Sequence, residues 1–158
     1  MKQLSIWFAI FLSSTSSMAK EIKTIIVIQA SPEKVWSILT HFENYPEWNP
    51  FIINVNGEVQ EGNTISISIQ PPKGSRIKFK PKVLSRKKNE HLSWKGKVII
   101  KGLFDGLHQF ELIDNKDGTT TFLQSEKFTG IFVWLFNTNK TENGFNAMNR
   151  KLKALAEI

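Results

Sequence analysis

The sequence predicts an α+β fold in which helices cover one face of an antiparallel sheet. A β-branched run at residues 24–28 follows the first twenty residues, and a helix start comes directly after it. Short segments of strand character then succeed one another through turns, which is typical of hairpins. The last part of the chain instead repeats its apolar residues at helical spacing. Helices at both ends of a series of hairpins indicate a sheet with its helices on one face.

The first helix is predicted to begin at Ser31, whose hydroxyl can accept an otherwise unpaired backbone N–H. Pro32 fits the first helical turn, and Glu33 places a negative charge near the positive end of the helix dipole. An apolar stripe follows at helical spacing: Val35, Trp36, Ile38 and Leu39. Pro46 and Pro50 end any long helix, so a second short helix is predicted between loops at residues 44–50. The aromatic residues of this break are expected to pack where the short helices meet the end of the long one: Tyr45, Trp48 and Phe51.

Seven strands are predicted: residues 22–30, 51–59, 64–70, 76–86, 91–100, 102–114 and 120–129. In the third strand, Ile65, Ile67 and Ile69 alternate with serines, so the isoleucines share one face. Pro81 lies inside the fourth strand and indicates an edge or a bulge there. Residues 115–118 are the expected turn of the last hairpin.

A long final helix is predicted over residues 131–157. Its apolar positions recur at helical spacing and include Leu135, Phe145, Met148, Leu152 and Leu155. A helix of about 25 residues is roughly 37 Å long and can cross the whole sheet. Residues 137–144 are poor helix formers, so a kink or a second helix start is expected among them. A curved sheet cannot close completely around one helix, and the gap between them is the natural place for a pocket.

The first 19 residues have the features of a secretion signal. Lys2 supplies a positive charge, residues 4–12 are apolar, and residues 17–19 form a small-x-small cleavage site. The sequence therefore predicts a signal peptide at 1–19, a single domain at 20–158, and export to the periplasm or the extracellular space. An uncleaved membrane anchor is the alternative. The chain contains no cysteine, which excludes disulfides and thiol catalysis.

The net charge of +7 is spread along the chain, with a modest concentration at residues 73–88. A basic surface of this kind favours transient contact with an anionic membrane or acidic ligands. No nucleic-acid-binding motif is present, so nucleic acid is not an expected partner. The sequence also lacks a phosphate-binding glycine loop, a nucleophile elbow and metal-ligand spacing, so neither a cofactor nor a metal is expected.

Several stretches carry a resemblance to a known family. They are residues 31–51 (SPEKVW through NYPEWNPF), residues 108–112 (HQFEL), residues 117–120 (DGTT) and residues 126–130 (EKFTG). This pattern resembles the START-like helix-grip superfamily, also called SRPBCC, which includes polyketide cyclase/dehydratase and lipid-transfer members. The resemblance implies a curved antiparallel sheet of about seven strands wrapped around a long C-terminal helix, with two short helices after the first strand. The family shares a cavity and not a reaction.

His108 is the histidine with the clearest candidate role. It alternates with Phe110 and Leu112, so it should face the apolar side of the sheet as a core histidine or as a pocket group. A five-residue hairpin loop would place His108 directly opposite Glu126. A register shift of one residue would turn Glu126 to the other face. The remaining histidines have simpler interpretations: His41 suits the end of the first helix, and His91 is expected to face solvent beside a turn.

Aromatic residues make up 11% of the chain. This content fits a lined cavity and an ordinary aromatic-rich core equally well. The candidate ligand-binding residues are Trp48, Phe51, Trp94, Phe104, His108, Phe110, Gln124, Glu126, Phe128, Trp134, Phe145 and Met148. The hypothesis for function is binding or carriage of a hydrophobic small molecule or lipid. One alternative is a polyketide cyclase/dehydratase-like enzyme that uses His108 and Glu126 as acid and base. A second alternative is a stress or interaction protein without a ligand.

Overall fold

The computed structural model describes residues 19–97, 105–130, 133 and 137–158. Within them the chain forms eight strands, three α-helices and one 3-10 helix. In chain order these are β1 (Ala19–Ile28), α1 (Pro32–Leu39), η1 (Phe42–Asn44), α2 (Tyr45–Trp48), β2 (Ile52–Asn56), β3 (Ser66–Ile69), β4 (Ile77–Phe79), β5 (Lys82–Lys87), β6 (His91–Lys97), β7 (Asp105–Asp114), β8 (Thr120–Thr129) and α3 (Asn139–Ala156). The predicted α+β fold, with a curved antiparallel sheet and a long C-terminal helix, is confirmed.

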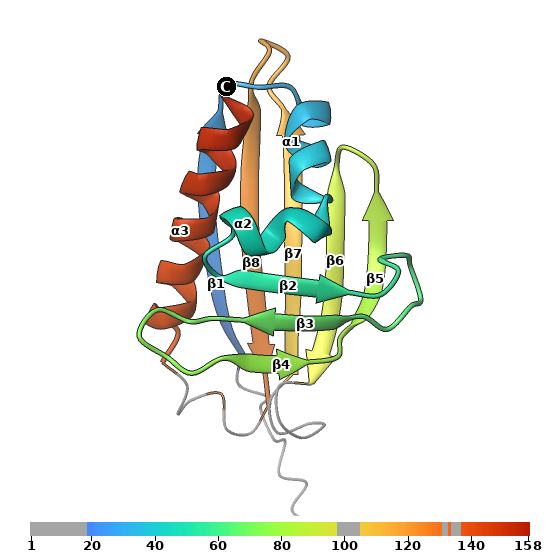
Figure 1. Cartoon of the computed structure of the whole chain (residues 1–158), viewed down its shortest axis with the longest axis vertical. Helices are drawn as coiled ribbons and strands as arrows, with labels where there is room; N and C mark the ends of the chain where they lie inside the picture. Colours follow the sequence, from blue (N-terminus) through green and yellow to red (C-terminus); the bar gives the residue numbers. More distant parts are fainter. Residues whose placement is uncertain (1–18, 98–104, 131–132, 134–136) are drawn as a thin grey trace, which may run out of the picture.

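The strands form two antiparallel sheets. A five-stranded sheet has the order β1-β8-β7-β6-β5, and a three-stranded sheet has the order β2-β3-β4. Figure 1 shows the smaller sheet crossing in front of the lower half of the larger one, with α3 running upward beside β1. The short helices α1 and α2 cover the upper part of the same face. In the lower half of the molecule, therefore, the two sheets face each other, with α3 along one side.

The predicted start of the first helix is observed. Ser31 Oγ accepts a hydrogen bond from the Lys34 N–H at 3.4 Å, and Pro32 is the first helical residue. After α2, the Asn49 side chain redirects the chain, because its Oδ1 accepts the N–H groups of Phe51 and Ile52 at 3.0 and 2.9 Å. This cap turns the chain into β2, which pairs with β3 from Ile52 onward.

The predicted fourth strand is two strands in different sheets, so the strand count is eight. The chain pairs with β3 up to Phe79 and joins the five-stranded sheet from Lys82 onward. Pro81 lies at the crossing, where its missing N–H cannot donate to either ladder. Its carbonyl oxygen still accepts the Ile65 N–H at 3.0 Å, so the crossing is held to the strand beside it.

The final helix begins at Asn139, eight residues after the predicted position. Its start falls within the poor helix formers 137–144, where the sequence indicated a second start. The Asn137 Oδ1 accepts the Asn139 N–H at 2.9 Å. Before it, Gly130 has a φ of 139° and ends β8 in a conformation that a side chain disfavours. No helix within the described ranges has the length and apolar content needed to cross a membrane.

The aromatic residues of the helix break form a dry cluster around Tyr45, which is fully buried. The rings of Phe42 and Trp48 lie 5.2 and 5.1 Å from the Tyr45 ring, centroid to centroid. The Tyr45 hydroxyl donates a hydrogen bond to the carbonyl oxygen of Leu39 at 2.5 Å. Burial raises the pKa of the Tyr45 phenol far above its usual range, because a phenolate there would lose its hydration.

Candidate functional site

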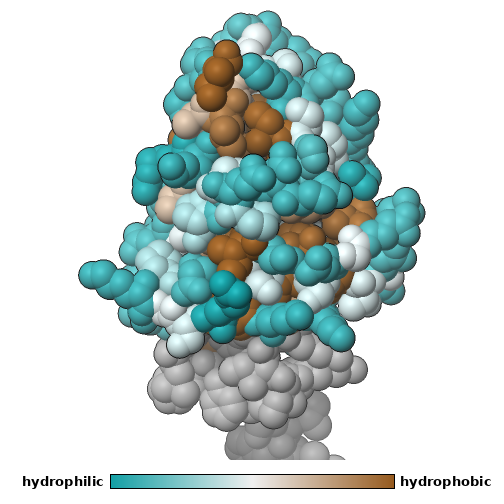
Figure 2. Space-filling model, viewed as in Figure 1, coloured by the Kyte–Doolittle hydropathy of each residue, from teal (hydrophilic) through white to brown (hydrophobic). Residues whose placement is uncertain are grey.

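A cavity of about 80 Å³ lies between the two sheets near the beginning of α3 and is partly open to solvent. Most of its lining is apolar. The lining residues are Phe51, Ile52, Ile67, Ile69, Ile77, Phe79, Trp94, Gly96, Gly106, His108, Glu126, Phe128 and Thr141. The isoleucines of β3 point into it, as their alternation predicted. Figure 2 shows the opposite side of this wall, where apolar surface is visible between polar side chains over the three-stranded sheet.

Two glycines make the room for this cavity. Gly96 of β6 and Gly106 of β7 are direct partners across the ladder and both line the cavity. A Cβ at Gly96 would lie 3.2 Å from the Pro81 Cβ, and a Cβ at Gly106 would collide with the Glu126 Oε1. The absence of a side chain at Gly106 therefore leaves space for the Glu126 carboxylate, and its absence at Gly96 leaves space for Pro81 and Phe79.

His108 and Glu126 form the polar group of the cavity wall. They are direct partners across β7 and β8, which is the register that the sequence predicted for them. The His108 Nδ1 lies 2.6 Å from the Glu126 Oε2, and their side chains are 4% and 15% exposed. A short contact of this kind is a charge-assisted hydrogen bond.

The His108 ring is held in place on several sides. It stacks on Trp94 at 4.8 Å with an interplanar angle of 8°. Phe110 and Phe145 contact it with their edges or faces at right angles, at 4.5 and 5.2 Å. Because these neighbours are buried, the ring has one orientation in which Nδ1 faces Glu126.

Gln124 lies on the other side of the His108 ring. Its Nε2 is 3.4 Å from the His108 Nε2 and 3.6 Å from the sulfur of Met148, while its Oε1 is buried without a hydrogen-bond partner. The Gln124 amide therefore lies within hydrogen-bond reach of the ring nitrogen that faces away from Glu126. On the other side of the ring, the His108 Nδ1–H donates to the Glu126 carboxylate.

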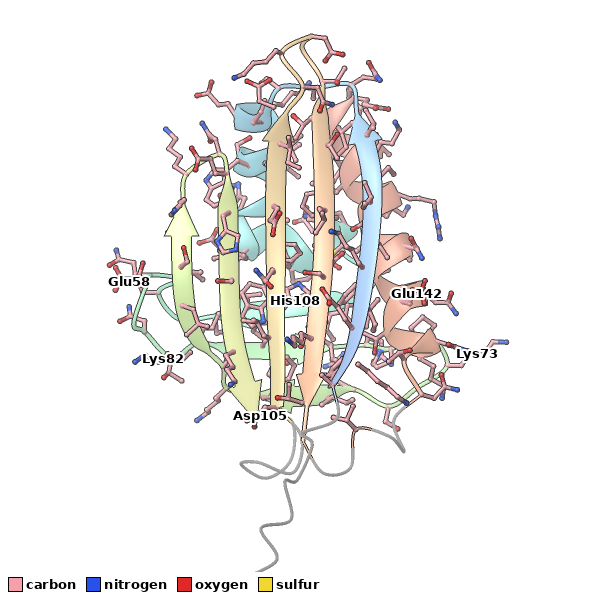
Figure 3. The ribbon with its side chains drawn as sticks, turned by 180° about the vertical axis from the view of Figure 1, so that it is seen from behind. Glu58, Lys73, Lys82, Asp105, His108 and Glu142 are labelled. Carbon is pink, nitrogen blue, oxygen red and sulfur yellow. The ribbon has the colours of Figure 1, made fainter. Side chains whose placement is uncertain are left out.

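Figure 3, seen from behind the five-stranded sheet, places His108 near the centre of the molecule on β7. The other labelled charged residues lie at the edges: Glu58, Lys73, Lys82, Asp105 and Glu142. Among the described residues, no group of three His, Asp or Glu side chains is arranged to hold a metal ion. The site therefore offers one carboxylate, one imidazole and a large apolar wall.

The candidate residues fall into four groups. Those that line the cavity are Phe51, Trp94, His108, Glu126 and Phe128. Those buried behind its wall are Phe110, Gln124, Phe145 and Met148. Trp48 lines a separate surface hollow with His41 and Leu155. Phe104 and Trp134 lie outside the described residues.

The aromatic residues of the helix break also separate in space. Phe51 packs against Phe145 near the beginning of α3, with ring centroids 5.4 Å apart, whereas Trp48 lies near Leu155 at the other end. The expectation that all three aromatic residues pack at one end of the helix is therefore wrong. Between Trp48 and Phe51, the change of direction at Asn49 and Pro50 takes the chain from the C-terminal end of α3 toward its beginning.

Sequence reasoning missed the two glycines and Thr141. The signal for the glycines was present: Gly96 and Gly106 each follow the alternation of large inward residues on their strands. A glycine at such a position removes a side chain from the core face.

The structure also places the other two histidines. His41 is exposed and lies 3.4 Å from Glu43, and His91 is half-buried beside Gln109.

A curved antiparallel sheet that encloses a cavity against a long C-terminal helix defines the helix-grip class of proteins. Residues 19–157 match the family described as polyketide cyclase / dehydrase and lipid transport, and the chain belongs to that family. No protein with a curated description matches the sequence.

Several solved structures have the same fold. Protein CV1439 from Chromobacterium violaceum has a TM-score of 0.70 at 17% identity, covering 87% of this chain and 97% of that one. The ginseng (Panax ginseng) major latex-like protein 151 has a TM-score of 0.70 at 11% identity, covering 87% and 97%. A truncated norcoclaurine synthase from Thalictrum flavum has a TM-score of 0.66 at 12% identity, covering 91% and 97%. At these identities the likeness shows the fold.

Proposed function

We propose that this protein binds or carries a hydrophobic small molecule or lipid in the cavity between its sheets and α3. The observation that carries the proposal is an apolar cavity whose wall presents one hydrogen-bonded polar pair, Glu126 and His108. Binding sites for small molecules commonly combine an apolar lining with a few convergent polar groups. Membership of a family associated with lipid transport supports the same function.

Burial of apolar ligand surface would drive binding in this cavity. Burying about 300 Å² of a ligand at ~25 cal/mol per Å² gains several kcal/mol before the costs of association. The cavity of about 80 Å³ is small beside the ~300–1,000 Å³ of typical ligand sites. A compact ligand fits this cavity, and a longer one would extend from it toward solvent.

Native mass spectrometry of the purified full chain, followed by organic extraction, tests the proposal. A co-purifying apolar molecule supports it. A protein that is always empty and takes up no apolar probe would contradict it and would favour a stress or interaction protein without a ligand.

A variant that fills the cavity makes this test specific. Ile69 is half-buried on the cavity wall, so Ile69→Trp should occupy the space and abolish uptake of a small apolar probe such as n-hexanol. Leu84→Trp is the matched control, because Leu84 is 41% exposed on β5 and does not line the cavity. Equal binding by both variants would place the ligand elsewhere.

Acid–base catalysis is the second candidate function. It is favoured by the Nδ1–Oε2 distance of 2.6 Å in a cavity, which is the geometry of a carboxylate that holds an imidazole. Because the His108 Nε2 faces Gln124, the Glu126 carboxylate is the group that can reach a substrate. In an enzyme, Glu126→Gln should lower turnover about 10²-fold or more at nearly unchanged affinity. In a carrier, the same change and His108→Ala should alter affinity alone.

The proposed function includes export of the protein from the cytoplasm. Export after removal of residues 1–19 predicts that mature protein begins at Lys20, which N-terminal sequencing of periplasmic or secreted material would show. Retained Met1 in a membrane fraction would contradict export.

Contact with an anionic membrane is supported by exposed cations around β4: Lys73, Arg76, Lys78, Lys80 and Lys82. Ile77 of the same strand lines the cavity and is 38% exposed. Cosedimentation with phosphatidylserine vesicles, lost in high salt and absent with phosphatidylcholine vesicles, is the expected result. Equal sedimentation with both kinds of vesicle would contradict an electrostatic contact.

A further inference from the structure

We propose that the cavity takes its ligand polar end first, so that a hydrogen-bond donor on the ligand contacts Glu126 and the apolar part points toward β4. This inference rests on the proposed binding function and names the orientation and the chemical class of the ligand. Three features of the cavity carry it: its closed end, its opening at β4 and the position of its polar groups.

The cavity ends at one row of the five-stranded sheet. Trp94, His108 and Glu126 are cross-strand neighbours in this row, and all three line the cavity. In the next row toward the β7–β8 hairpin, the inward residues are fully buried and lie outside the cavity lining: Leu92, Phe110 and Gln124. The stacked rings of Trp94 and His108 therefore separate the cavity from the packed core.

The opposite end of the cavity reaches the surface at β4. Ile77 of this strand lines the cavity and is 38% exposed, and Phe79 lines it and is half-buried. A Cβ at Gly96 would lie 3.3 Å from the Phe79 ring, so β4 crosses the larger sheet at the row of glycines. Figure 1 shows β4 across the lowest part of that sheet, and Figure 3 shows His108 above Asp105, which lies at the lower end of β7. A ligand that enters beside β4 therefore moves toward His108.

The hydrogen-bonding side chains of the described lining are concentrated at the closed end. Glu126 and His108 lie there, whereas β3 and β4 contribute only apolar side chains to the lining. Thr141, on the first turn of α3, is the third polar residue of the described lining. An ionised carboxylate has about four acceptor positions, so the hydrogen bond from His108 leaves others for a ligand.

The two possible orientations of an amphiphile differ in their effect on Glu126, whose side chain is 15% exposed. An apolar end that entered first would cover the carboxylate without replacing its water by a hydrogen bond, and burial of this kind is costly. A polar end that enters first donates an N–H or O–H to the carboxylate, while the apolar end contacts the isoleucines of β3 and β4. The second orientation keeps the carboxylate hydrogen-bonded and also buries apolar surface.

The inferred ligand class is a compact amphiphile with a hydrogen-bond donor at one end, such as a short alcohol. The donor is required because a carboxylate oxygen accepts hydrogen bonds and cannot donate them. The enclosed part of the ligand is short, because the cavity holds about 80 Å³. A longer apolar part leaves the cavity beside Ile77.

The experiment compares two isomeric alcohols by calorimetric titration of the full chain at pH 7. In 4-cyclohexyl-1-butanol the ring is at the apolar end, and in 1-cyclohexyl-1-butanol the same ring is beside the hydroxyl. The first isomer should bind at least about tenfold more tightly, because its ring extends past β4, whereas a ring beside the hydroxyl would collide with Trp94 and His108.

A second comparison tests the contact with Glu126. We expect n-hexanol to bind at least about tenfold more tightly than 1-methoxyhexane, which has no donor. Glu126→Leu removes the acceptor and should reduce this ratio to within about threefold. Glu111→Leu is the matched control: Glu111 is half-buried on the same strand as His108, faces away from the cavity and should leave the ratio unchanged.

The outcomes separate this inference from the proposed function. Equal binding of the two isomers, tighter binding of 1-cyclohexyl-1-butanol, or a preference for hexanol that survives in Glu126→Leu would overturn the orientation and leave apolar binding intact. Binding of hexanol without either isomer would also overturn it, because the cavity would then not open toward β4. The isomers are compared on the unmodified protein, so the orientation is tested even if Glu126→Leu does not fold. If no probe binds and extraction recovers no apolar molecule, both the binding function and this inference are wrong.

Discussion

Along the inward face of the five-stranded sheet, one end is closely packed and the other end is open, although the same three strands build both. Toward the β7–β8 hairpin, the inward positions are large: Leu92, Phe110, Leu112 and Phe122, all buried. Four to six residues away along each strand, the inward positions are Gly96, Gly106 and Phe128, which line the cavity. The change occurs at one row, where Trp94, His108 and Glu126 are cross-strand neighbours.

This difference shows how a binding site can be made in a continuous sheet without altering its backbone. The strands keep their register through both regions, so the core end can pack rigidly and position the other end. The His108 ring lies at the boundary: Phe110 and Trp94 hold it from the packed side, and its proton is directed at the carboxylate of the open side. A rigid support for a polar group lowers the cost of ordering it when a ligand binds.

The largest expected effect compares two phenylalanines on one face of β8. Phe122 is fully buried and stacks on Phe110 at 5.8 Å, whereas Phe128 is buried but borders the cavity. Phe122→Ala should lower the free energy of unfolding by about 3–5 kcal/mol, and Phe128→Ala by at least ~1 kcal/mol less, because fewer atoms surround it. Urea unfolding of both variants measures this. Equal losses would mean that the open end is packed as tightly as the other.

The next effect concerns the helix that closes the cavity. Gly144 lies inside α3, where alanine would ordinarily stabilise by about 1 kcal/mol. Here a Cβ would collide with the ring of Phe51, so Gly144→Ala should destabilise by about 1–3 kcal/mol and move Phe51 in the cavity wall.

Glu142→Ala is the control for Gly144→Ala, because it is an exposed position on the first turn of the same helix. Thermal unfolding of the two variants separates the helix preference from the collision. A Gly144→Ala variant that is more stable than the original protein would show that Phe51 moves aside without cost.

A smaller effect tests the dry cluster of the short helices. Tyr45→Phe leaves the Leu39 carbonyl without its donor and should cost about 1 kcal/mol near neutral pH. Burial raises the pKa of Tyr45 above its usual 10.0, so the unfolded chain loses the phenol proton first as the pH rises. The stability that Tyr45 contributes is therefore complete below pH 10 and falls above it.

Tyr45 is the single tyrosine of the chain, so the phenolate absorbance reports this residue alone. The absorbance should rise only together with unfolding, and the fall in stability above pH 10 should be shallower in Tyr45→Phe. Phenolate formation in protein that remains folded would show that the cluster admits water.

The smallest effect separates the two hollows of the molecule. Trp48 lines the surface hollow near Leu155, whereas Phe51 lines the cavity. Trp48→Ala should change the affinity for n-hexanol by less than about twofold, and Phe51→Ala should weaken it by more, because Phe51 lines the cavity and Trp48 does not. A larger loss in Trp48→Ala would place the entry route or the ligand beside the short helices.

Much of this fold follows from the sequence because its signals are local. Ser31 and Pro32 begin a helix through the backbone groups of its own first turn, and residues 115–118 form a turn whose length sets the pairing of β7 with β8. Once that register is set, the two-residue alternation of a strand places His108 opposite Glu126 on the inward face. The pair was predictable because only one turn and one periodicity decide it.

The tertiary structure decided the features that depend on segments far apart in the chain. Pro81 indicated an irregular strand, but only the pairing of Phe79 with β3 and of Lys82 with β6 shows that the chain changes sheets there. In the same way, the glycines at 96 and 106 form a cavity only because they are partners in the ladder and the three-stranded sheet lies across them.

The hydrogen bonding of the His108 ring is a further feature that the tertiary structure decided. The sequence placed this histidine beside a carboxylate, but the contact that directs its other nitrogen comes from Gln124, with Met148 of α3 behind it. Alternation and turn length specify which residues share a face, because they act within a few residues of backbone. Rotamers, cavities and hydrogen-bond directions are set by whatever packs on that face, and those atoms come from distant segments, as the hydrogen bond between Asn149 and Thr24, 125 residues apart, shows.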